Sequence, residues 1–240
     1  MIDLLTPERT TGSRPDDPES AKYVRSFLFM RLAVGALGVA LPVVLMLVDG
    51  FWFDGDPFPR DSLSAYFYSG GREVFVGTLC AIGVFLVTYK AAERTLDNTL
   101  SLIAGAGAAV VALFPTDRPL SDIRLTPLQD RVGEEVVKWV HFGGAAVFIG
   151  ALGVITYYFG VREGARPPRE GNRSPAFWRW FHWACAGAIG LAVLWIAVTQ
   201  LAGRPRTSLL IGETAAVWAF GVSWFAKGAE WDVLFGRRDG

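Results

Sequence analysis

Apolar residues are gathered into six long segments along this chain, separated by shorter polar stretches. A helix needs about 20 residues to cross the hydrocarbon layer of a bilayer, which is about 30 Å thick. The segments lack the two-residue alternation of barrel strands, and lipid tolerates only helices or closed barrels. We therefore predict an all-α polytopic membrane protein with six transmembrane helices in one bundle, at about 27–48, 72–89, 99–114, 138–161, 178–202 and 208–226.

Composition agrees with this pattern. Of the 240 residues, 52% are hydrophobic and 19% are charged, which is too apolar for an ordinary soluble domain. The formal net charge is zero, so there is no electrostatic basis for nucleic acid as a partner. Cys80 and Cys185 lie inside apolar segments. We expect them to behave as small buried hydrophobic residues without a disulfide or a metal.

Basic residues predict the orientation. If the amino terminus is inside, the inner side carries 15 of the 23 Lys and Arg residues, and the inner stretch 162–177 alone contains four arginines. This distribution predicts that both termini are cytoplasmic. We further expect residues 1–25 to be a disordered cytoplasmic arm, 26–227 to be the transmembrane domain, and 228–240 to be a tail resting on the inner membrane surface.

Small residues recur at four-residue spacing within the apolar segments. Gly105 with Ala109, and Ala146 with Gly150, are examples. Such spacing lets helix backbones approach closely, so the segments should pack into one compact bundle. The same small-residue faces leave open a homo-oligomer or a partner subunit.

The remaining polar residues converge on the outer side of the predicted membrane. Given this topology, we select six candidates for ligand binding or for a proton relay: Arg72, Glu73, Asp117, His141, Gln200 and Glu213. Glu213 is the most informative, because five uncharged residues flank it on each side. A buried ionisable group costs about 2.5 kcal/mol or more unless it faces a partner in the bundle.

Each candidate also has a purely structural interpretation. Glu213 and His141 could be hydrogen-bonding anchors between helices, and Asp117 could cap a helix end or pair with Arg118 or Arg124. Arg72 and Glu73 could simply begin a helix, although Arg72 would also suit a carboxylate or an anionic lipid headgroup as counter-ion.

Other polar positions have mainly structural interpretations. Glu134 and Lys138 have the spacing of a solvated helix pair. His182 lies near the inner surface among tryptophans, so only one histidine is left on the outer side and a three-histidine zinc site is excluded within one subunit. Asp61 or Ser62 could cap a short surface helix ending at Tyr68. Ser64 lacks a GxSxG or SxxK context, which makes it a weak candidate nucleophile.

The order of several motifs resembles a known family. LSLIAGAGAAVVALFPTD, then the histidine of KWVHFGGAAVF, an arginine-rich inner loop and the Gly-Glu that opens the last segment resemble the six-span bacterial membrane family called domain of unknown function number 998. The likeness covers about 100–227 and implies six helices in a bacterial cytoplasmic membrane, without an established activity. In that family the final Glu is often followed by Arg, whereas Thr214 follows Glu213 here.

A more distant likeness concerns the helix-borne Asp, His and Glu, which are similar to those of the alkaline ceramidase superfamily of membrane hydrolases. Those enzymes need three histidines for their metal, and this chain has two in total. A hydrolase interpretation therefore requires carboxylate ligands or a reaction without metal.

Three functions follow from the candidate residues. The favoured one is binding of a membrane lipid or another small amphipathic molecule in an outward-facing polar pocket. The alternatives are an intramembrane lipid hydrolase, with Asp117, His141 and Glu213 as metal ligands or as acid and base, and a proton-coupled transporter that uses the same acids as a relay. The sequence leaves open whether the protein is an enzyme, and it indicates no cofactor.

Overall fold

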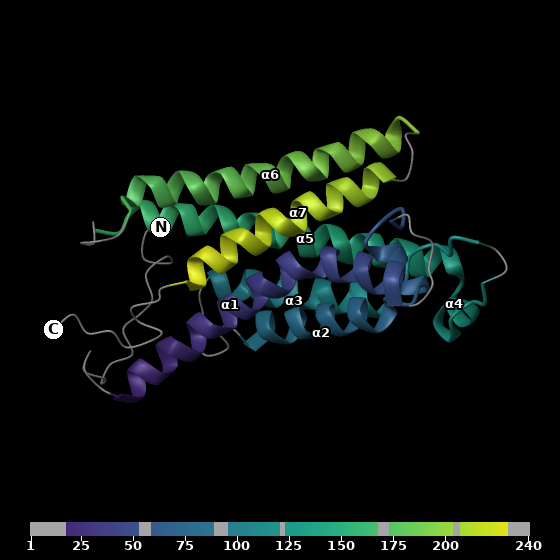
Figure 1. The fold of residues 1–240 in the computed structure, drawn as a ribbon, viewed down its shortest axis with the longest axis horizontal. Coiled ribbons are helices and arrows are strands. Elements are labelled where there is room, and N and C mark those ends of the chain that lie inside the picture. The colour runs from purple at the N-terminus through teal and green to yellow at the C-terminus, as the bar shows by residue number, and fades with distance from the viewer. Residues whose placement is uncertain are drawn as a thin grey trace.

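The computed structural model describes residues 18–52, 59–88, 96–120, 123–167, 173–203 and 207–229. Within these ranges the regular secondary structure is entirely helical (Figure 1). The elements are α1 (Pro18–Leu47), η2 (Val48–Trp52), η3 (Ser64–Tyr68), α2 (Arg72–Thr88), α3 (Leu96–Leu113), α4 (Pro127–Val132), α5 (Glu134–Gly164), α6 (Pro175–Leu201) and α7 (Thr207–Gly228). All six predicted apolar segments are helices.

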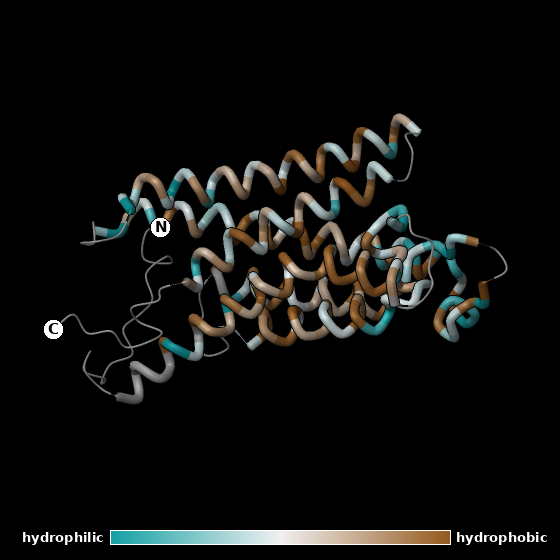
Figure 2. The backbone as a smooth tube through the Cα atoms, viewed as in Figure 1, coloured by the Kyte–Doolittle hydropathy of each residue, from teal (hydrophilic) through white to brown (hydrophobic). Residues whose placement is uncertain are grey.

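Among the described residues, four stretches of helix are long and apolar enough to cross a membrane. They are Val24–Phe51, Glu134–Gly164, Pro175–Leu201 and Thr207–Gly228. The apolar part of α3, Asn98–Leu113, is shorter, and α2 has 17 residues. The chain is therefore a membrane-embedded, multi-pass protein. Figure 2 agrees, because hydrophobic residues dominate the middle of the long helices and hydrophilic residues gather at both ends.

The long helices pack in a closed ring that follows their order in the chain. Contacts join α1 to α2, α2 to α3, α3 to α5, α5 to α6 and α6 to α7, and α7 closes the ring against α1. Large side chains fill the centre, among them Leu45, Leu86, Ile155, Phe159 and Trp224. The first residue of α1 and the last residue of α7 lie at the same end of the ring (Figure 1).

Glycines set several of the closest helix contacts. A Cβ added to Gly35 in α1 would lie 2.4 Å from the backbone nitrogen of Phe225 in α7. A Cβ on Gly105 in α3 would lie 2.8 Å from the Gly83 oxygen in α2, so the predicted close approach at this small residue is confirmed. The prediction is wrong for Gly150, where an added Cβ meets nothing within 4 Å, and Ala146 is exposed. That face of α5 points out of the ring.

The surface of α6 is suited to lipid. Leu191, Leu194, Trp195, Val198 and Leu201 in its second half are all exposed. Such a continuous apolar surface is rare on soluble monomers. Trp195 nonetheless contacts the protein, because its indole Nε1 donates to the Ser208 carbonyl oxygen at 2.9 Å. This bond ties the end of α6 to the start of α7.

Two predicted boundaries need correction. Helix α1 begins at Pro18, so residues 18–25 are helical rather than part of a disordered arm. Proline at the first helical position has no amide hydrogen to lose and a preset φ angle, and the helix can extend beyond its apolar part. The rest of the arm, 1–17, and the tail at 230–240 lie outside the described residues. The helix predicted at about 138–161 begins at Glu134, directly after Gly133, whose φ of 93° favours glycine.

Candidate functional site

The segment before α2 folds back onto the helix ends. The N-cap of η3 is Leu63 rather than the predicted Asp61 or Ser62, although Ser62 Oγ accepts from the Ala65 amide at 3.0 Å. Leu63, Ser64 and Tyr66 are buried, and the Leu210 amide of α7 donates to the Asp61 carbonyl oxygen at 3.0 Å. The η3 segment is thus a packed part of the structure and closes this end of the ring.

Glu213 binds the start of η3. Its Oε2 accepts from the Leu63 amide at 2.5 Å. The sequence predicted that Glu213 would need a partner in the bundle. The partner is the Leu63 backbone amide rather than a basic side chain, so Arg72 is not its counter-ion.

His141 is held from both sides. Its ring is 2% exposed, with Nδ1 2.6 Å from the Phe114 carbonyl oxygen and Nε2 3.0 Å from Ser64 Oγ. A carbonyl oxygen only accepts, so Nδ1 carries a proton. The end of α3, the first residue of η3 and the first part of α5 are thereby joined at one imidazole.

Ser64 and its neighbour Leu63 attach the start of η3 to two helices. Ser64 Oγ binds His141 of α5, and the Leu63 amide binds Glu213 of α7. Ser64 lies in no nucleophile motif and was a weak candidate from its sequence context. Its contact with His141 comes from the fold of the segment before α2, which a single serine in the sequence does not signal.

Asp117 lies near His141 but belongs to an ionic cluster at the surface. Its Oδ1 is 3.5 Å from Lys138 Nζ, and its side chain is 43% exposed. Lys138 Nζ is also 2.5 Å from Glu135 Oε1. The partner of Asp117 is therefore Lys138, not Arg118 or Arg124.

The predicted Glu134–Lys138 pair is wrong. Arg118 instead binds Glu134 with two guanidinium nitrogens, each 2.9 Å from a carboxylate oxygen. These bonds raise the pKa of Arg118 above its ordinary value. A planar guanidinium that reaches both carboxylate oxygens is a better partner than the ammonium one turn away.

The group of His141, Ser64 and Glu213 does not include Arg72, Glu73 or Gln200. Glu73 and Gln200 are exposed, on α2 and α6. The Arg72 guanidinium carbon lies 4.3 Å from the centroid of the Phe67 ring. Among the described residues, the candidates thus separate into the buried His141 and Glu213, the surface cluster of Asp117, and Arg72 beside η3.

Arg72 lines a pocket of about 390 Å³ between η3 and the stretch before α4. Arg124 also lines it, and Phe67, Ile123 and Leu125 supply apolar surface. The pocket thus combines two guanidinium groups with apolar surface. Its full lining is Phe67, Tyr68, Ser69, Arg72, Ile123, Arg124, Leu125, Thr126 and Pro127.

A hydrogen-bond network holds Tyr68 and the start of α4 together beside this pocket. The Tyr68 hydroxyl donates to the Thr116 carbonyl oxygen at 2.8 Å and accepts from Gln129 Nε2 at 2.7 Å. Gln129 is 1% exposed and completes a capping box with Thr126 at the start of α4. Burial raises the pKa of the Tyr68 phenol, so the phenol stays protonated and able to donate at neutral pH.

Replacing Tyr68 by phenylalanine is expected to destabilise the protein by about 1–3 kcal/mol, because the Gln129 amide and the Thr116 carbonyl each lose a partner. Equilibrium unfolding in detergent measures the change. Tyr157→Phe is the matched control, since Tyr157 is exposed on α5 and should behave like the wild type. Equal stabilities for the two variants would contradict the network.

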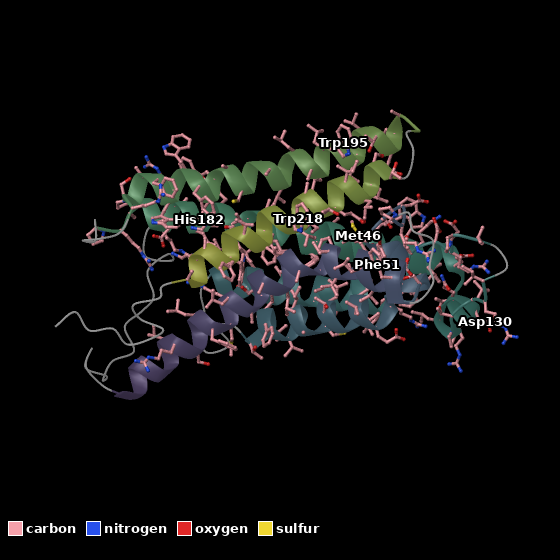
Figure 3. All side chains as sticks on the ribbon, viewed as in Figure 1. Met46, Phe51, Asp130, His182, Trp195 and Trp218 are labelled. Carbon is pink, nitrogen blue, oxygen red and sulfur yellow. The ribbon has the colours of Figure 1, made fainter. Side chains whose placement is uncertain are left out.

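The opposite end of the ring holds a second polar cluster. His182, labelled in Figure 3 far from Asp130, was expected among tryptophans, and its ring centroid lies 6.3 Å from that of Trp178. It is 1% exposed, with Nδ1 2.8 Å from Ser223 Oγ. Nearby, Lys227 Nζ binds Glu163 Oε1, and both residues are buried.

No group of three His, Cys, Asp or Glu residues that could hold a metal ion occurs in the described part of the chain. Comparison with protein-family models, with curated proteins and with solved structures finds no match. The resemblances drawn from the sequence motifs therefore stay predictions. The features that bear on function are the pocket and the hydrogen bonds of His141 and Glu213.

Proposed function

We propose that the protein binds an anionic amphiphile in the pocket between η3 and the stretch before α4. We further propose that it crosses the bacterial cytoplasmic membrane six times as a six-helix bundle, with both termini in the cytoplasm. The observation that carries the proposal is the pairing of Arg72 and Arg124 around one pocket of about 390 Å³. The six crossings are supported by the ring of long helices, in which α1 begins and α7 ends on the same side (Figure 1).

The charge of the ligand follows from the arginines. Guanidinium groups bind phosphate and carboxylate oxygens through paired hydrogen bonds. Arg72 also stands in the first turn of α2, where the helix dipole disfavours a cation. An anion in the pocket would offset that unfavourable interaction and would be attracted by the same helix end.

The apolar part of the ligand follows from the walls of the pocket. Phe67, Ile123 and Leu125 line it, and the Phe67 ring also supports the Arg72 guanidinium. A site with an apolar wall, a charged group and a position at the end of membrane helices suits a headgroup with an attached chain better than a fully hydrated ion. Asp117, His141 and Glu213 do not line this pocket, so the headgroup site differs from the acid-rich pocket expected from the sequence.

Replacing both Arg72 and Arg124 by glutamine is expected to weaken binding of phosphatidic acid at least tenfold, because each charge-assisted hydrogen bond contributes about 1.5–3 kcal/mol. Binding is measured in detergent, from the rise in thermal denaturation midpoint on adding short-chain phosphatidic acid. Phosphatidylcholine with the same chains should give a smaller rise, since its headgroup has no net charge.

The matched control is Arg131→Gln. Arg131 is exposed in α4 and does not line the pocket, so this variant should respond to phosphatidic acid like the wild type. An unchanged response in the Arg72→Gln, Arg124→Gln double variant would refute the proposal, as would equal responses of the wild type to the two lipids. Inorganic phosphate distinguishes the sources of the anion: a response to phosphate as strong as to phosphatidic acid would mean that the lipid chain contributes nothing.

A further inference from the structure

Two side chains of α6 lie across glycines of α5 where α5 ends and α6 begins. A Cβ added to Gly164 would lie 2.7 Å from Arg179 Cδ, and one added to Gly160 would lie 2.4 Å from Trp183 Cδ1. The glycines therefore make room for an arginine and a tryptophan one turn apart on α6. Hydrophilic residues gather at this end of both helices (Figure 2).

The Arg179 guanidinium is held against aromatic rings. Its carbon lies 5.6 Å from the centroid of the Trp183 ring and 5.9 Å from that of Trp180. Arg179 is half-buried, and its Nε is buried without a hydrogen-bond partner among the described residues. A guanidinium that is partly removed from water in this way is stabilised by an anion that binds its remaining donors.

The surrounding charge is positive. Arg162 and Arg166 lie at the end of α5, and Arg173 lies just before α6. Within the described residues 159–167 and 173–181 the one acid is Glu163. Its carboxylate binds Lys227 of α7 and lies 3.0 Å from Arg166 Nη1. The arginines of this region thus outnumber its acid, and they are complementary to an anionic lipid headgroup.

Helix dipoles distinguish the arginines of the two helices. Arg162 stands in the last turn of α5, where the dipole favours a cation. Arg173 and Arg179 stand at the amino end of α6, where the dipole favours an anion, and the first turn of α6 contains no acidic residue. An anion bound here would interact favourably with both arginines and with the helix end.

Exposed apolar side chains adjoin these arginines. The Tyr157 ring stacks on Trp183 with centroids 5.7 Å apart, and Tyr157 is itself exposed. An exposed stripe then runs along α6, one or two turns at a time, through Trp180, Ala184, Ala188 and Leu191. Aromatic rings beside basic groups at the end of membrane helices are typical of the headgroup region of a bilayer. This surface therefore suits a phospholipid better than a free anion.

We propose that the seam between the end of α5 and the start of α6 is a second lipid site, which binds the phosphate of an anionic phospholipid through Arg173 and Arg179. The acyl chains of this lipid lie along the exposed stripe of α6. In the proposed topology the site faces the cytoplasmic leaflet. It lies at the opposite end of the ring from the pocket of Arg72 and Arg124 and does not depend on that pocket.

The test uses the Arg72→Gln, Arg124→Gln double variant as the parent protein, so that the outer pocket does not contribute. Dioleoyl phosphatidylglycerol is titrated into the parent in detergent, and the bound lipid is counted by native mass spectrometry. Adding Arg179→Gln is expected to weaken binding at least about tenfold, as for the loss of a charge-assisted hydrogen bond. Phosphatidylcholine with the same chains should bind the parent more weakly, because its headgroup has no net charge.

Arg25→Gln is the matched control. Arg25 is exposed at the same end of the ring, on α1, which packs on α2 and α7. This variant removes the same charge away from the seam and should bind phosphatidylglycerol like the parent. Arg173→Gln changes an exposed residue, should also weaken binding, and carries the test if Arg179→Gln does not fold.

Three results would overturn the second lipid site. They are unchanged binding in the seam variants, an equal loss in Arg25→Gln, and equal binding of the two lipids by the parent. Displacement of phosphatidylglycerol by an equal concentration of inorganic phosphate would overturn the assignment to a lipid, since the site would then hold a free anion. Every protein in this test lacks Arg72 and Arg124, so its failure leaves the proposal for the outer pocket intact.

Discussion

Replacing Glu213 by alanine is expected to lower the free energy of unfolding by about 1–3 kcal/mol, because the Leu63 amide loses its acceptor and an unpaired buried amide costs about 1–3 kcal/mol. Leu63 directly precedes η3 and is buried. Loss of Glu213 therefore also loosens the segment that closes this end of the ring. Equilibrium unfolding in detergent, followed by tryptophan fluorescence, measures the change.

The glutamine variant separates the hydrogen bond from the charge. Glu213→Gln has nearly the same shape and keeps a carbonyl oxygen that can accept from the Leu63 amide, so we expect it to lose clearly less stability than Glu213→Ala. Wild-type stability for Glu213→Ala would show that the contacts of Glu213 with η3 contribute nothing to folding.

The second large effect concerns the seam between α1 and α7. Gly35→Ala places a methyl group 2.4 Å from the Phe225 nitrogen and 2.8 Å from the Gly221 oxygen. Both are backbone atoms, so no side chain can rotate away and the two helices must separate. Overpacking of this kind costs about 1–3 kcal/mol, and more where backbone must move. We expect a clear fall in thermal denaturation midpoint in detergent.

Gly77→Ala is the control for this effect. Gly77 lies within α2, and a Cβ added there meets nothing within 4 Å. Alanine has the higher helix propensity, so the variant should be as stable as the wild type or slightly more stable. If Gly35→Ala and Gly77→Ala unfold at the same midpoint, the close approach of α1 to α7 does not determine stability.

Long-range features were predictable where they rest on periodicity and length. The six apolar segments predict the long helices, because only regular helix satisfies the backbone in lipid. The placement of His141 and Glu213 at one end of the bundle followed from topology, since alternating crossings bring the start of α5 and the start of α7 to the same side. Their structural interpretation as hydrogen-bonding anchors also agrees with the bonds to Phe114, Ser64 and Leu63.

Contacts made by loops were not predictable. Ser64 reaches His141 only because the stretch before α2 turns inward and packs on α7, and no local motif encodes that path. The preference of Glu134 for Arg118 over Lys138 depends likewise on how the chain leaves α3. The pocket combines residues near 70 with residues near 125, and nothing in their spacing signals that they meet.

Helix α5 is fixed by polar contacts near both of its ends. His141 binds Phe114 and Ser64 on one side, and Glu163 binds Lys227 on the other. At 1.5 Å per residue the two side chains are about 33 Å apart along the helix, close to the hydrocarbon thickness of about 30 Å. Sliding α5 by one turn would break both sets of bonds. Helix α5 cannot change its depth in the membrane independently of its neighbours. In a bilayer thicker or thinner than its apolar part, the lipid next to α5 must therefore change thickness instead.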